Sequence, residues 1–266
     1  MKQSKIFLFL AIILVILFTL SSCSGLTNNT TTTNPVNTGK EPSTDSAESY
    51  TPQTPAPGLY QNGELVKTWE ELLSAKLVSI HPDTGALGSG YVPNPAGGIG
   101  KNKSSLNLTG ELVLSTDIKS IAGRGLSSLE NLTSVTIPAS VTSLGAGAFE
   151  NCQSLKSVTF EEGCQITKID YVTFFICSSL ESIILPKGVE TIGIDAFNGC
   201  TSLTSVTIPE SVTIIRMGAF ANCNNLSSIT FQGTMKQWKT ISKGWFWNFG
   251  VPATYVQCSD GRVKLK

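Results

Sequence analysis

The chain has 266 residues, of which 19 are basic and 19 acidic, so its formal net charge is zero and only 14% of residues are charged. This fraction is below the roughly 25% of a typical soluble protein and argues against a polyanion-binding protein, which needs clustered lysine and arginine. The single histidine, His81, argues against histidine-based catalysis and multi-histidine metal sites, and seven cysteines are too few for a disulfide scaffold.

Residues 1–22 have the pattern of a secretion signal. Two lysines precede the apolar run 6–20, which as a helix spans about 22 Å and is shorter than the roughly 30 Å hydrocarbon core of a membrane. The sequence Leu-Ser-Ser-Cys that ends at Cys23 resembles a bacterial lipobox, which implies acylation of that cysteine. The alternative is an ordinary secretion signal with an incidental cysteine. On the same resemblance, Ser24 in place of an aspartate favours the outer membrane over the inner one.

Residues 23–58 are rich in Thr, Ser, Pro and Asn and contain almost no large apolar side chains. Such a segment cannot bury enough surface to offset the entropy of ordering it. We therefore expect a disordered, partly extended tether. It carries the next domain away from the membrane, which the lipid on Cys23 holds.

Residues 59–105 are expected to cap the N-terminal end of the repeats that follow. Apolar side chains in 64–76 have helical spacing and predict an amphipathic helix. These residues are Leu65, Trp69, Leu72 and Leu73.

Residues 106–231 contain five short segments that repeat the pattern Leu-x-Ser-(Val/Ile)-x-apolar. Their leading leucines lie 23, 25, 23 and 23 residues apart: Leu132, Leu155, Leu180, Leu203 and Leu226. The two extra residues fall at 161–165, and every later position keeps its phase. One short strand per period with fixed apolar positions predicts a β-rich solenoid, in which stacked neighbours share one core.

Two further columns of residues repeat in phase, one of phenylalanine and one of cysteine. They are Phe149, Phe174, Phe197 and Phe220, then Cys152, Cys177, Cys200 and Cys223. With Ser-Leu-Thr-Ser-Val-Thr-Ile-Pro-Glu-Ser-Val-Thr at 202–213 and Gly-Ala-Phe-Ala-Asn-Cys at 218–223, the repeats resemble the BspA-type leucine-rich repeat. The resemblance implies a bacterial surface protein that attaches to host matrix proteins or to other bacteria.

Residues 232–266 are expected to close the other end, because an open solenoid end exposes apolar core and a free strand edge. Aromatic residues crowd one part of this segment: Trp238, Trp245, Phe246, Trp247 and Phe249. Residues 254–266 predict a hairpin around Asp260-Gly261.

Catalysis, cofactors and metals find no support in the residues. Successive cysteines of a solenoid stand in a straight row, which cannot supply the tetrahedral ligands of zinc, so small buried thiols are expected. The positions of Cys164 and Cys258 stay open. Residues 95–101 are not a phosphate loop, because Pro95 and Asn102 stand where the motif needs glycine and serine or threonine.

Two kinds of surface are candidates for ligand contact. The first is a face of outward strand residues on neighbouring rungs: Ser134, Thr136, Ser157, Thr159, Ser205, Thr207, Ser228 and Thr230. The second is a pair of aromatic side chains, Trp245 and Trp247, that can stack on sugars or anchor a partner.

We therefore expect a lipid-anchored protein of the bacterial cell envelope, at the outer membrane or cell surface, that binds a protein and catalyses no reaction. The alternative is a periplasm-facing scaffold or carbohydrate-binding lipoprotein that uses the tryptophan-rich end. Nucleic acid is not an expected partner, since basic residues are sparse.

Overall fold

The computed structural model describes residues 55–74, 79–80, 86–88 and 108–265. The predicted signal peptide, Cys23 and all but the end of the predicted tether lie outside these residues.

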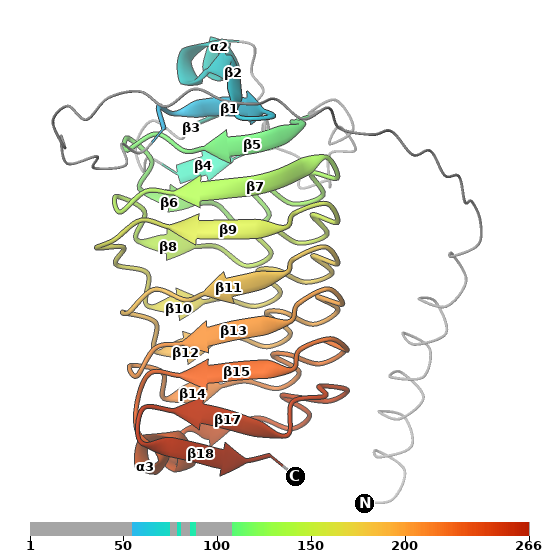
Figure 1. Ribbon diagram of the computed structural model, residues 1–266. Helices are drawn as coiled ribbons and strands as arrows, with labels where there is room; N and C mark the ends of the chain where they lie inside the picture. Colours follow the sequence, from blue (N-terminus) through green and yellow to red (C-terminus); the bar gives the residue numbers. More distant parts are fainter. Residues whose placement is uncertain (1–54, 75–78, 81–85, 89–107, 266) are drawn as a thin grey trace, which may run out of the picture. The chain divides into compact units, whose positions relative to one another are not determined.

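Two ladders of stacked strands form the body of the protein (Figure 1). The longer strands are β5 (Gly110–Val113), β7 (Leu132–Ile137), β9 (Ser157–Phe160), β11 (Ser182–Ile184), β13 (Ser205–Ile208), β15 (Ser228–Phe231) and β17 (Tyr255–Cys258). The shorter ones are β4 (Ala86–Gly88), β6 (Ser120–Ile121), β8 (Ser143–Leu144), β10 (Lys168–Ile169), β12 (Thr191–Ile192), β14 (Ile214–Ile215) and β16 (Ser242–Lys243). Neighbouring strands within each ladder are parallel and in register, which confirms the predicted β-solenoid.

Strand alternation explains which side chains enter the core. In β13, Val206 is 1% exposed, whereas Ser205 and Thr207 on either side of it are half-buried and point outward. The register places Val206 beside Ile183 of β11 and Ile229 of β15. Each rung therefore adds one apolar residue to a continuous buried column.

The phenylalanine column is a stack of nearly parallel rings. Ring centroids lie 5.3 Å apart between Phe149 and Phe174, 5.2 Å between Phe174 and Phe197, and 5.1 Å between Phe197 and Phe220. All four side chains are fully buried. A single rung supplies only one ring, so the stack depends on neighbouring rungs.

The cysteine column is buried as predicted, and each thiol has a structural role. Each Sγ donates a hydrogen bond to a backbone carbonyl of the preceding rung. The pairs are Cys152 to Leu126 at 3.0 Å, and Cys177 to Phe149, Cys200 to Phe174 and Cys223 to Phe197, each at 3.1 Å. Cys164 and Cys258 are buried too, at 7% and 3% exposure.

Both ladders are interrupted at one level, between β9 and β11 and between β8 and β10. The loop between these rungs is the one with two extra residues, at 161–165. The turns that lead from each short strand to the next long strand remain connected there, since Phe149 N donates to Thr173 O at 2.9 Å. Just before the long strands, Glu181 N also donates to Lys156 O at 3.0 Å. We call this interruption the seam.

The N-terminal cap differs from the prediction. Residues 64–68 are a strand, β2 (Glu64–Thr68), which forms a hairpin with β1 (Gly58–Gln61), and only α2 (Trp69–Ser74) is helical. Asn62 and Gly63 turn the hairpin with φ of 53° and 81°, and Asn-Gly is a strong hairpin signal that overrides the helical spacing. Trp69 and Leu72 are buried as expected, but Leu65 is 45% exposed.

The hairpin covers the first rung, because β1 pairs antiparallel with β5. The short strand β3 (Ser79–Ile80) pairs antiparallel with β4 and begins the second ladder. Both ladders thus start with antiparallel pairing that the repeats do not use.

The repeat geometry extends past residue 231, which corrects the predicted boundary of the C-terminal cap. Strand β16 pairs parallel with β14, and β17 pairs parallel with β15, so residues 232–258 contain another rung. An inserted helix, α3 (Met235–Thr240), lengthens this rung and hides its phase. The predicted hairpin around Asp260 and Gly261 is present, and its second strand, β18 (Gly261–Lys264), closes the ladder.

Candidate protein-binding face

The outward strand residues lie on one face of the longer ladder. The register pairs Ser134 with Ser157, Thr136 with Thr159, Ser205 with Ser228 and Thr207 with Thr230. None of them is buried. Parallel strands about 4.8 Å apart repeat the same hydroxyl positions from rung to rung. We call these residues, with Ser182 and Ile184 of β11, the strand face.

A shallow depression of about 460 Å³ lies on the strand face over β5, β7 and β9. Its lining residues are Glu111, Thr133, Ser134, Thr136, Lys156, Ser157 and Thr159. Hydroxyl groups both donate and accept hydrogen bonds, and the lining adds one carboxylate and one ammonium group. The depression therefore suits a polar, uncharged or charge-balanced partner surface.

A larger cleft of about 750 Å³ opens at the seam, between β9 and β11. Ile184 lines it and is 67% exposed, at a position where the paired strand β13 carries Thr207. Val158 is also slightly exposed, at 7%, although its counterpart Val206 in β13 is at 1%. The interruption of the ladder thus gives the otherwise polar strand face one apolar site.

Sequence reasoning missed this apolar site, although a signal for it was present. The segment Leu-Glu-Ser-Ile-Ile-Leu at 180–185 has isoleucine where the other four repeats have threonine. The extra residues at 161–165 were located correctly, but the pattern alone did not reveal that they interrupt both ladders.

The two candidate tryptophans have different environments. Trp245 is 79% exposed, whereas Trp247 is 8% exposed. The Trp247 ring lies edge-on to Phe220, with centroids 6.3 Å apart, and 5.9 Å from Trp238. Trp247 therefore closes the phenylalanine stack and is not available as a contact residue, which corrects the expectation of an aromatic pair.

The described thiols are poorly suited to nucleophilic chemistry. Burial raises the pKa of Cys223 to about 12 and raises the pKa of the Cys177 and Cys200 thiols as well. The thiolate is the reactive form, so these cysteines are unreactive at neutral pH. Among the described residues, His, Cys, Asp and Glu form no group that could hold a metal ion. No helix in the described part of the chain is long and apolar enough to span a membrane.

Parallel ladders, a 23-residue period and aligned leucine, phenylalanine and cysteine columns define a leucine-rich repeat protein. The family described as BspA type leucine rich repeat region matches residues 108–250 in 6 copies, which is more than half of the chain. The chain belongs to this family.

Solved structures of other leucine-rich repeat proteins are similar to this chain. A leucine rich cell surface protein from Faecalibacterium prausnitzii is 39% identical over 50% of this chain, with a TM-score of 0.48, and this chain spans 34% of its length. The leucine-rich repeat protein of T. pallidum is 20% identical, with coverage of 66% and 87% and a TM-score of 0.46. A leucine-rich repeat protein from Eubacterium ventriosum is 22% identical, with coverage of 65% and 48% and a TM-score of 0.47. No curated protein sequence matches the chain.

Proposed function

We propose that this chain is a lipid-anchored protein of the bacterial cell surface that binds a protein ligand through its strand face. The observation that carries the proposal is the aligned Ser/Thr face interrupted at the seam by an exposed isoleucine beside a cleft. Protein interfaces combine a small desolvated apolar centre with a polar rim, and the strand face offers both.

The remaining parts of the chain support display at a surface. A lipid on Cys23 attaches the chain to a membrane, and the tether 23–58 gives the repeats reach. A cell surface protein is also among the similar solved structures. The ligand class is a matrix protein or a surface protein of another bacterium, and the interaction involves no chemical turnover.

The strand face is tested by replacing Ile184 with the threonine of the other repeats. Ile184→Thr removes the exposed apolar side chain but keeps a residue that the fold accepts at this position. We expect retention of the protein on an array of extracellular-matrix proteins and glycans to weaken about tenfold on the matrix-protein spots, equivalent to about 1.4 kcal/mol. Circular dichroism should show an unchanged fold.

Val66→Thr is the matched control, because Val66 is 46% exposed on β2, the edge strand of the N-terminal sheet, which β1, β5 and β7 separate from β9. It should leave retention unchanged. The proposal fails if Ile184→Thr binds as tightly as the unmodified protein. Retention on glycan spots alone, lost on Trp245→Ala, would favour the carbohydrate-binding alternative.

The lipid anchor is tested separately by Cys23→Ser. A serine lacks the thiol that takes the lipid, so we expect an unprocessed precursor that incorporates no labelled fatty acid. Cys258→Ser is the control, since Cys258 is buried in the repeats and should not affect labelling. A labelled band of unchanged intensity in Cys23→Ser would refute the assignment. Protection of the repeats from protease added to intact cells would refute surface display.

A further inference from the structure

A column of exposed apolar side chains runs along the turns that lead from each short strand to the next long strand. Backbone hydrogen bonds fix its members at equivalent positions of successive turns. Tyr171, Ile194, Met217 and Trp245 accept through their carbonyls from Gly147 at 2.9 Å, Val172 at 3.0 Å, Asp195 at 3.0 Å and Gly218 at 3.2 Å. We call these four residues the turn stripe.

The turn stripe and the aromatic residues beside it form an apolar patch at or above the upper end of the size found on folded monomers. Tyr171 is 50% exposed, Ile194 37%, Met217 49% and Trp245 79%. Phe246 and Phe249 extend it at the C-terminal end, at 61% and 57% exposure, with their rings edge to face and 6.1 Å apart.

Its area is close to what one side of a stable interface needs. Aromatic side chains present roughly 150–250 Å² each, and with a similar area for Ile194 and Met217 the six exposed fractions together amount to roughly 500–800 Å². The largest apolar patch of a typical monomer is about 300–600 Å² and is often functional. A standard protein interface buries about 800 Å² on each partner.

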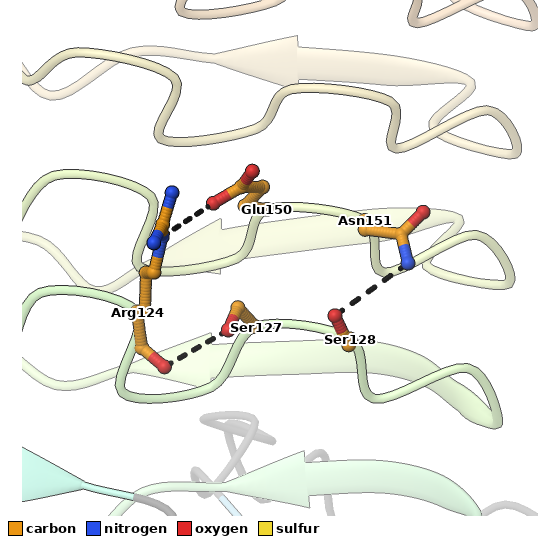
Figure 2. A network of polar contacts seen from close by, with 5 residues as sticks. All are labelled: Arg124, Ser127, Ser128, Glu150 and Asn151. Carbon is orange, nitrogen blue, oxygen red and sulfur yellow. Dashed lines mark hydrogen bonds and ion pairs between the residues drawn. The ribbon is translucent and has the colours of Figure 1, made fainter. Parts of the chain in front are cut away.

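The opposite end of the same column is small and polar. The position before Tyr171 in the column is Ala146, and beside it Arg124 Nε contacts Glu150 Oε2 at 2.8 Å (Figure 2). In the same network, Ser127 Oγ donates to Arg124 O at 3.0 Å, and Asn151 Nδ2 donates to Ser128 Oγ at 3.5 Å. The turn face is therefore graded, with small residues at one end and the bulky Trp245 at the other.

We propose that the turn stripe binds the turn stripe of a second copy of this chain, in antiparallel orientation. The twofold axis lies in the plane of the contact at the level of Ile194, perpendicular to the length of the turn stripe. It sets Trp245 of one copy against the small Ala146 of the other. It also sets Met217 against Tyr171. Such an isologous contact buries the same patch on both copies and closes without forming a fibre.

Charge complementarity favours this arrangement over other occupants. Asp170 precedes Tyr171 and Arg216 precedes Met217, so the same axis brings Asp170 of each copy opposite Arg216 of the other. Within the described residues, Arg216 has no ion pair, and Asp170 has one with Lys168 at 2.9 Å. An anionic membrane needs a basic surface, which these balanced charges do not provide. The two Asp195 side chains also approach the axis, and each already accepts from Asn198 Nδ2 at 2.9 Å.

The proposal is tested by a cysteine placed at the axis of the full chain in intact cells. Ile194→Cys puts two thiols opposite each other, and copper-phenanthroline should oxidise them to a disulfide that doubles the apparent mass on a non-reducing gel. The six described native thiols are buried, so they contribute little background. Ile184→Cys is the matched control, because Ile184 is exposed on the strand face and should stay monomeric.

Two further variants test the geometry. Adding Trp245→Asp to Ile194→Cys should reduce the cross-linked fraction at least tenfold. Adding Asp170→Arg should reduce it because two arginines then face each other, and Asp170→Arg with Arg216→Asp should restore it. The proposal is overturned if Ile194→Cys reacts with maleimide but forms no dimer, if it cross-links to a different protein, or if Ile184→Cys dimerises equally. A failure here leaves the strand face untouched, since Ile184→Thr tests that face by ligand retention.

Discussion

Replacing Val206 by aspartate is expected to unfold the repeats on both sides of β13. Val206 is 1% exposed and packs in register between Ile183 and Ile229. An unpaired carboxylate cannot be solvated there, so we expect a loss of at least about 4 kcal/mol, which is a large part of a typical domain stability of 5–15 kcal/mol. The measurement is urea unfolding followed by circular dichroism.

Thr207→Asp is the matched control for this prediction. The adjacent side chain points outward and is half-buried at the strand face, so the same charge remains in contact with water. We expect a change within about 1 kcal/mol. Equal unfolding of both variants, or an unchanged transition for Val206→Asp, would show that the assigned strand phase is incorrect.

Phe197→Ala should remove about 3–5 kcal/mol from the free energy of unfolding. Its ring stacks on Phe174 at 5.2 Å and on Phe220 at 5.1 Å, and it is fully buried. Truncation leaves a cavity in the middle of the stack and removes both ring contacts. Thermal and urea unfolding of the purified protein measure the loss.

Phe175→Ala is the comparison, because Phe175 follows the stacked Phe174 but is only half-buried. The cost there should be less than half that of Phe197→Ala. Similar losses for the two variants would contradict the prediction that the fully buried, stacked ring stabilises the fold more than the half-buried one.

The core could be read from the sequence because its positions repeat. The positions of Val206, of Phe197 and of the cysteines within the repeat follow from a strict period. In a solenoid, residues at the same position of each repeat share one orientation, so the inward-facing positions can be assigned. The strand face followed from the same phase, since the residues between inward positions must point outward.

The ends of the repeat array were harder to predict, because neither end keeps the period. At the N-terminal end, helical spacing of apolar residues conflicted with the Asn62-Gly63 turn, and the hairpin formed. At the C-terminal end, α3 separates Met217 from its counterpart Trp245. The extra rung could therefore not be recognised from the spacing.

The outward residues of the turns keep the period, since Ala146, Tyr171, Ile194 and Met217 each precede an aligned phenylalanine by three residues. Ala146, Tyr171, Ile194, Met217 and Trp245 differ in size and polarity. Trp245 lies beyond α3 and out of phase, so the hydrogen bond from Gly218 N to Trp245 O is needed to show that it continues the column.

The seam gives the molecule a defined mechanical weak point. In the proposed role, with the lipid holding the N-terminal end and the strand face bound to a ligand, tension passes along the stack of rungs. Most rungs share that load through two hydrogen-bonded ladders. Across the seam, few backbone hydrogen bonds join β9 to β11, and the turns and the stacked rings of Phe149 and Phe174 provide the other contacts. The stack should part there first, into two blocks that each keep their own ladders. Under the proposed function, a chain pulled in this way would lengthen at the seam before its ligand is released.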